Sequence, residues 1–145
     1  MSDLVKPVDD GFYIGCGRHS EVGLHMEFAA ADDDCIESRV TIGRTYQGWR
    51  GVVHGGIVGL LLDEAMAYAA GARGIVGVTA HLKMRFRRAV PIDAPLLVRG
   101  WVLWQRRNVL GVAATVAGGD GTILATGEGR FVARGTLEPG ERLGA

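Results

Sequence analysis

The sequence has little that would support a disulfide scaffold, a zinc site, a secreted precursor or a membrane span. Its two cysteines, Cys16 and Cys35, form no CxxC motif and have no histidine at zinc-ligand spacing. The N-terminus has no basic start followed by an apolar run, so we expect no signal peptide. No apolar run is long enough to span a bilayer. We therefore expect free thiols in a reducing compartment, a cytoplasmic location and no membrane association.

The sequence also lacks an excess of either charge. Lys+Arg and Asp+Glu both number 16, so the formal net charge is zero, which gives no support for nucleic-acid binding. There is no P-loop and no Gly-x-Ser-x-Gly elbow, and the GxG at Gly15–Gly17 lacks the third glycine of a dinucleotide fingerprint. We expect no nucleic-acid partner, no cofactor and no metal.

Glycine, in contrast, is abundant. It occurs 23 times in 145 residues, against about 7% in ordinary chains, and it falls at turns and strand ends. A chain of this length can bury a real core. We expect a single domain over residues 1–145, with loose ends at residues 1–10 and 135–145.

One stretch organises the rest: Val53–Ala70, VHGGIVGLLLDEAMAYAA, predicts a helix that is apolar on nearly every side. Its only formal charges are Asp63 and Glu64, and buried carboxylates must be paired, hydrogen-bonded or used. Its His-Gly-Gly start is expected to leave backbone N–H groups free at the positive end of the helix dipole. Because no second helix follows, a sheet must curl around this one or a second copy must cover it.

Alternating apolar and polar residues predict antiparallel strands on both sides of the helix. In the strand after the helix, Thr79 is expected on the polar face together with Arg85 and Arg87. One helix against such strands is an α+β arrangement. The expected strands are Gly23–Ala31, Cys35–Ile42, Val78–Arg87, Leu96–Gln105, Leu110–Ala117 and Thr122–Ala133.

The two carboxylates of the helix receive different predictions. Asp63 lies seven residues after Gly56, two turns on the same face, so it can act as a nucleophile or general base toward a carbonyl that the Gly55 and Gly56 amides polarise. An ordinary solvent-facing or arginine-paired carboxylate fits Asp63 equally well. Glu64 lies about 100° around the helix and is expected to face solvent or to pair with an arginine.

The other candidate residues each have a structural alternative. His54 could be a catalytic base, although a histidine before a helix more often caps it. Thr79 alone would be an ordinary strand threonine. The two basic clusters are either solvated surface or a seat for phosphate groups. They comprise Arg85, Arg87 and Arg88 in one and Arg106 and Arg107 in the other.

YQGWRGVVHGGIVGLLLDEAM followed by GVTAHLKMRFRRAVPIDAPLLVRG resembles the PaaI-like hotdog-fold acyl-CoA thioesterases. The resemblance covers roughly residues 14–133. Its signature is HGG, an Asp nine residues after the His, and a Ser or Thr opening the next long strand. Here these are His54-Gly55-Gly56, Asp63 and Thr79.

The resemblance implies a hotdog fold, in which a curved antiparallel sheet wraps around the long central helix. It also implies a homodimer or homotetramer with active sites at the subunit interface and acyl-CoA as substrate. Asp63 would attack the thioester or activate water, and the Gly56 amide, with Gly55, would hold the oxyanion. His54 would orient the thioester and Thr79 would position water or the carboxylate. The implied coenzyme A contacts are Arg85, Arg87, Arg106, Arg107 and Asn108.

One position departs from the pattern. Several members carry an Asn six residues before the HGG histidine, where this chain has Gly48, with Gln47 beside it. Either Gln47 substitutes for the Asn as a substrate-binding residue, or the thioester contact is missing. Two other functions remain open: a non-catalytic acyl-CoA-binding hotdog protein, and a hotdog enoyl-CoA hydratase or dehydratase. The HGG and Asp pattern fits thioester hydrolysis better than proton transfer at carbon.

Overall fold

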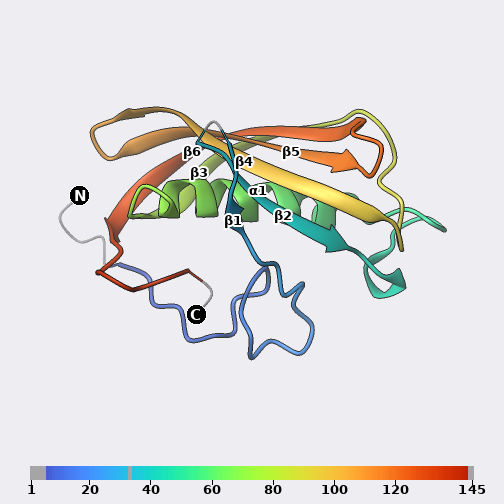
Figure 1. Cartoon of the computed structure of the whole chain (residues 1–145), viewed down its shortest axis with the longest axis horizontal. Helices are drawn as coiled ribbons and strands as arrows, with labels where there is room; N and C mark the ends of the chain where they lie inside the picture. Colours follow the sequence, from blue (N-terminus) through green and yellow to red (C-terminus); the bar gives the residue numbers. More distant parts are fainter. Residues whose placement is uncertain (1–5, 33, 144–145) are drawn as a thin grey trace.

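The computed structural model describes residues 6–32 and 34–143, and it has one long helix lying against a curved antiparallel sheet (Figure 1). Parts of the predicted loose ends, residues 1–5 and 144–145, lie outside the described residues. The elements are β1 (Ala29–Ala30), β2 (Ile36–Thr41), the 3-10 helix η1 (Arg44–Tyr46), α1 (Gly55–Gly71), β3 (Ile75–Phe86), β4 (Pro95–Arg106), β5 (Val109–Gly118) and β6 (Ile123–Thr136).

The six strands form one sheet in the order β1-β2-β4-β5-β6-β3, with every neighbouring pair antiparallel. Hairpins join β4 to β5 and β5 to β6, whereas β3 pairs with β6 and the chain then crosses to β4. This crossing leaves β3, the strand that follows the helix, at an edge of the sheet. The predicted α+β architecture, a curved sheet around a central helix, is confirmed.

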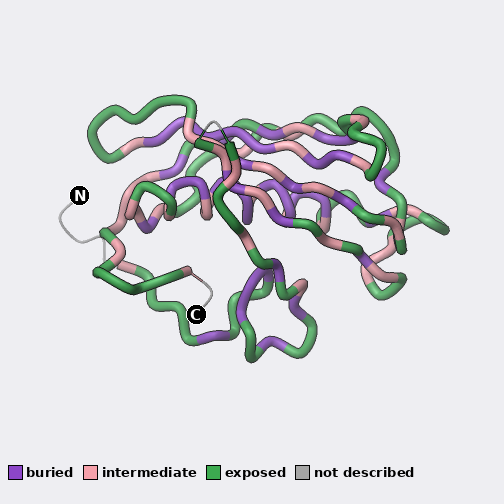
Figure 2. Tube along the Cα trace, in the orientation of Figure 1, coloured by how far each residue is buried: buried purple, intermediate pink, exposed green. Residues whose placement is uncertain are grey.

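The core lies between α1 and the concave face of the sheet. Leu61, Leu62 and Met66 of α1 are fully buried, as are Val112 of β5 and Phe131 of β6. Figure 2 shows buried positions concentrated in the helix and the central strands, and exposed positions at hairpin tips and in the N-terminal segment. That segment lies on the side of α1 away from the sheet (Figure 1). No helix in the described part of the chain has the length and apolar character needed to cross a membrane.

The ends of the sheet differ from the sequence prediction. The strand expected over Gly23–Ala31 is formed only at Ala29–Ala30, because the chain before it bonds to itself as a loop, with Leu24 and Met26 donating to Ile14 and Gly15. At the other end, β6 runs to Thr136, into the segment expected to be loose.

Strand β3 contains an irregularity that decides which way its polar residues face. Thr79 pairs with Phe131 and His81 with Arg130, so Ala80 has no partner of its own. An unpaired extra residue of this kind is a β-bulge, and it reverses the alternation of faces. The prediction that Thr79 shares the polar face of Arg85 is therefore wrong: Thr79 faces α1.

Candidate active site

The histidine of the HGG turn caps the helix. His54 is the N-cap residue of α1, and its Nδ1 accepts a hydrogen bond from the Gly56 N–H at 2.9 Å. Its own N–H donates to the Tyr46 carbonyl at 3.0 Å, which ties the turn to η1. The capping interpretation is thus confirmed. Because Nδ1 accepts, the proton of the neutral ring is on Nε2, which is left free to donate to a ligand.

The two glycine amides at the start of α1 differ in their hydrogen bonding. The Gly56 N–H is engaged by His54, so the expectation that it would be free is wrong for the unliganded protein. The Gly55 N–H has no acceptor among the described residues. The first N–H groups of a helix have no partner within it and carry the positive end of its dipole. The Gly55 amide can therefore receive a carbonyl oxygen directly, and the Gly56 amide can do so once the His54 ring turns away.

Asp63 and Thr79, separated by fifteen residues of chain, meet across the helix and the edge strand. The Thr79 hydroxyl donates to Asp63 Oδ1 at 2.7 Å. Asp63 is half-buried and Thr79 is exposed. The bulge at Ala80 makes this contact possible, because it turns Thr79 toward α1. One carboxylate oxygen is thereby held in place, and the other has no hydrogen-bond donor among the described side chains.

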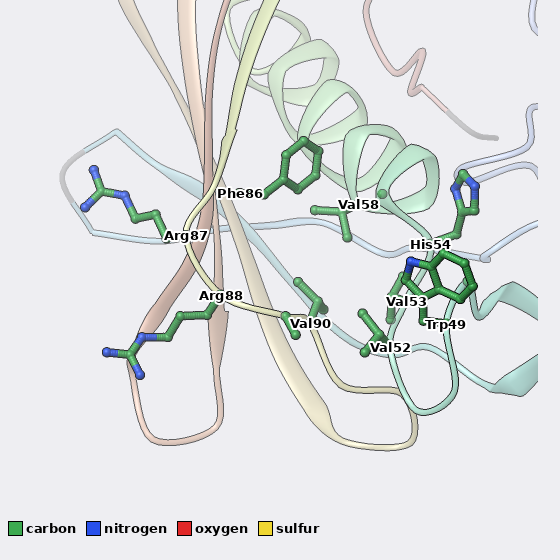
Figure 3. Close-up of a pocket in the computed structure, with 12 residues that line it drawn as sticks. Trp49, Val52, Val53, His54, Val58, Phe86, Arg87, Arg88 and Val90 are labelled. Atoms are coloured by element: carbon green, nitrogen blue, oxygen red, sulfur yellow. The ribbon is translucent and has the colours of Figure 1, made fainter.

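A cavity of about 650 Å³ opens beside the helix start. Val53, Val58 and Val90 give it an apolar wall next to His54 (Figure 3). Figure 3 also shows the Arg87 and Arg88 side chains extending away from these apolar groups. The remaining lining residues are Gly48, Trp49, Val52, Gly55, Phe86 and Ala89.

Two aromatic side chains of this cavity are unusually exposed. Trp49 is 87% exposed and Phe86 is 52% exposed, although the alternation of β3 places Phe86 on the buried face. Large exposed apolar side chains gathered at a cavity indicate a surface that a ligand or partner covers. Phe86 was missed as a site residue; its position opposite the HGG turn follows from the strand pairing, which the sequence alone does not reveal.

The model of the thioesterase superfamily matches residues 50–125, more than half of the chain. The chain belongs to the thioesterase superfamily. A search of curated proteins gave no match.

Solved structures agree with this membership. A thioesterase superfamily protein of known structure shares 29% identity with a TM-score of 0.80, over 84% of this chain and 60% of that one. A hypothetical thioesterase of Streptococcus pneumoniae, solved with coenzyme A, shares 18% identity with a TM-score of 0.73, over 78% and 91% of the two chains. The E. coli PaaI protein shares 19% identity with a TM-score of 0.71, over 78% and 82%. The hotdog fold and the PaaI-like resemblance are confirmed.

This thioesterase superfamily chain spans about 60% of the length of the first of these proteins. Its match covers the HGG turn, Asp63 and Thr79 together.

The two groups of predicted coenzyme A contacts lie in different places on the subunit. Arg85 and Arg87 lie at the end of β3 nearest the helix start and line a cavity of about 350 Å³. Arg106, Arg107 and Asn108 lie at the β4–β5 tip and line another of about 670 Å³, together with Trp104, Gln105, Val109 and Arg130. The register pairs this tip with the start of β3, near Val78. A strand advances about 3.3 Å per residue, so the two groups are some 20 Å apart along the sheet.

Gln47 has a local role. Its Oε1 accepts from the Gly51 N–H at 3.1 Å and closes the turn before the HGG motif. At Gly48, a Cβ would lie 3.3 Å from His54 Cα and 3.5 Å from its Cδ2. The absence of a side chain there leaves the His54 ring room to move.

The structure contradicts the prediction that Glu64 faces solvent or pairs with an arginine. It is 2% exposed, and its Oε2 has no hydrogen-bond partner among the described residues. Burial is the main reason that its pKa rises to about 7 from 4.5, with the charges of Asp63 and Asp9 adding to the rise and a hydrogen bond with Cys16 opposing it. It neither faces solvent nor pairs with an arginine, because the N-terminal segment covers it.

Proposed function

We propose that this chain is an acyl-CoA thioesterase that hydrolyses the thioester bond of acyl- or aryl-CoA substrates. The observation that carries the proposal is the 2.7 Å hydrogen bond from Thr79 to Asp63, two turns from a helix start with an unpaired amide. A thioester carbonyl bound at that amide would have its oxygen stabilised and its carbon open to attack. The superfamily membership and the coenzyme A bound to the Streptococcus pneumoniae protein support this class of substrate.

The chemistry requires one carboxylate and one oxyanion site. Asp63 either forms a bond to the thioester carbon or takes a proton from a water that does so. The Gly55 N–H, joined by Gly56 when His54 releases it, holds the oxyanion. The carbon–sulfur bond then breaks, and coenzyme A leaves as the thiol after taking a proton. If Asp63 attacks directly, water afterwards hydrolyses the anhydride. Thr79 orients the Asp63 carboxylate throughout.

We infer that the active form is at least a homodimer paired along β3. This edge strand is twelve residues long, and Val78 on it is 40% exposed. Long exposed edge strands invite pairing with another chain. Such pairing would place Asp63 and Thr79 near the subunit boundary, where the Arg106–Asn108 tip of a second copy could reach the substrate of the first.

Pairing along β3 can be tested by placing a charge on the strand. Val78→Lys is expected to convert the oligomer to monomers in sedimentation velocity, because a lysine on an edge opposes strand addition. Ile123→Lys, which charges an equally exposed position (39%) at the far end of β6, is the control and should leave the mass unchanged. A monomeric wild type would contradict the inference.

The activity is tested by following thiol release from a panel of acyl- and aryl-CoA esters. Asp63→Asn is expected to lower kcat at least ~100-fold, the usual size of a lost general base, with unchanged circular dichroism and Tm. Full activity in the variant would exclude Asp63 as the reacting carboxylate. Tight binding of the esters without thiol release would favour the acyl-CoA binder. Loss of enoyl absorbance would favour the hydratase.

A further inference from the structure

The N-terminal loop, residues 11–26, is a preformed unit. Gly17 and His19 donate to Tyr13 and Gly11 near its start, and Leu24 and Met26 donate to Ile14 and Gly15 across it at 2.9 Å each. These bonds occupy the backbone groups that would otherwise extend a strand. The loop therefore moves as one piece, and whatever holds Gly15 also holds Tyr13.

The loop is seated on Glu64. A Cβ built on Gly15 would lie 1.7 Å from Glu64 Oε2, so only glycine permits this approach. The carboxyl borders a cavity of about 90 Å³, which Tyr13, Cys16, Ala67 and Val76 help to line. The Glu64 carboxyl is thus a buried polar group aimed at the loop and not used by the proposed chemistry.

The groups around Glu64 disfavour its charge. From the loop, the Cys16 thiol hydrogen-bonds it and the Tyr13 phenol faces it, while Asp9 acts on it from just before the loop. From α1, the Asp63 charge acts on it, and Tyr68 lies within its electrostatic reach. Burial raises the pKa of Cys16 to about 12, so the thiol stays protonated. Among the residues that the structure describes, no positively charged group contributes to the pKa of Glu64. A neutral carboxyl fits this seat, whereas a carboxylate would be a buried charge without a cation.

Tyr13 belongs to the part of the loop that lies at this seat. It lines the same cavity as Glu64 and Cys16, and it remains 43% exposed. Burial raises the pKa of the Tyr13 phenol, and the charges of Glu64 and Asp63 raise it further.

We propose that Glu64 is a positioning residue for the N-terminal loop: its buried carboxyl, in contact with Gly15, seats the loop on α1. Ionising Glu64 puts a buried charge without a cation under the loop, which weakens the seat and lets the loop lift from α1. The seating of the loop does not depend on the proposed function.

The test is amide hydrogen exchange in the loop. Gly15→Ala is expected to speed exchange at Gly17, Leu24 and Met26 at least ~10-fold, because the added Cβ cannot fit against Glu64. Gly43→Ala is the matched control, since a Cβ there meets nothing within 4 Å, and exchange should stay at the wild-type rate.

The pH dependence separates positioning from mere packing. In the wild type, loop protection should fall above pH 7, whereas Glu64→Gln should keep it constant from pH 6 to 8.5. Equal exchange in Gly15→Ala and Gly43→Ala would overturn the proposal. So would a loss of loop protection in Glu64→Gln at pH 6. Failure of the proposed function would appear separately, as absence of thiol release by a wild type whose loop still responds.

Discussion

Two adjacent carboxylates on α1 lie in opposite surroundings. Asp63 is half-buried and held by a hydroxyl of the edge strand. Glu64 is 2% exposed and covered by the N-terminal loop, and its Oε2 has no hydrogen-bond partner in the described part of the chain. A single step along a helix turns a side chain by about 100°, and here it separates a half-buried carboxylate from one sealed by the protein. The difference teaches that neighbouring residues of one helix can occupy opposite environments, which is the basis of the different roles proposed for them.

Apart from substitutions of Asp63 itself, Thr79→Val is expected to have the largest effect on kcat. The valine keeps the shape but removes the donor to Asp63 Oδ1, so the carboxylate loses its orientation. We expect kcat to fall ~10- to 100-fold, measured by thiol release, because misplacing a reacting group costs about that much. Thr79→Ser, which keeps the hydroxyl, should retain most of the activity. A Thr79→Ser variant as impaired as Thr79→Val would contradict this, because it keeps the hydroxyl that donates to Asp63.

On the Glu64 side, the expected effect is on stability. Its pKa rises from 4.5 to about 7 on folding, so the stability that its neutral form contributes is fully present below pH 4.5 and is lost as the pH rises through 7. The wild type should lose about 3 kcal/mol of unfolding free energy between pH 4 and pH 8 relative to Glu64→Gln. Urea unfolding of the two proteins at several pH values measures this. If the unfolding free energies of the two proteins change with pH in parallel, the ionisation of Glu64 does not destabilise the fold.

The smallest effect concerns Cys16, which hydrogen-bonds Glu64. Cys16→Ala removes this donor and should destabilise the fold by about 1 kcal/mol more than Cys16→Ser, the usual net value of one hydrogen bond. Thermal unfolding in the same buffer distinguishes the two variants. If the serine variant is the less stable, burial of the hydroxyl costs more than its hydrogen bond contributes.

The sequence predicted the helix, the sheet and the Asp63–Thr79 pair for different physical reasons. The long apolar segment and the period-two strands predicted the α+β fold, because burial imposes these patterns. Thr79 was identified by family resemblance alone. The alternation of apolar and polar residues along β3 placed Thr79 on the wrong face, because it does not account for the bulge at Ala80. That bulge arises from the pairing of β3 with β6, which no local sequence pattern reveals.

Glu64 was mispredicted for a related reason. A helix carboxylate normally reaches solvent, and nothing in the local sequence indicates that a loop from residues 11–26 will cover it. Gly15 is the glycine that allows the loop to lie against Glu64. In the sequence it stood out only as part of the incomplete GxG motif at Gly15–Gly17. The capped state of the Gly56 amide also depends on a side-chain rotation of His54 that the sequence leaves open.

The most direct measurement compares Asp63→Asn and Glu64→Gln in one thiol-release assay at pH 6.5, with the best acyl-CoA of the panel. If Asp63 reacts and Glu64 only positions, Asp63→Asn loses at least ~100-fold in kcat, while Glu64→Gln keeps kcat within about threefold of wild type. A Glu64→Gln variant as inactive as Asp63→Asn, or an Asp63→Asn variant with wild-type kcat, would contradict this division of roles.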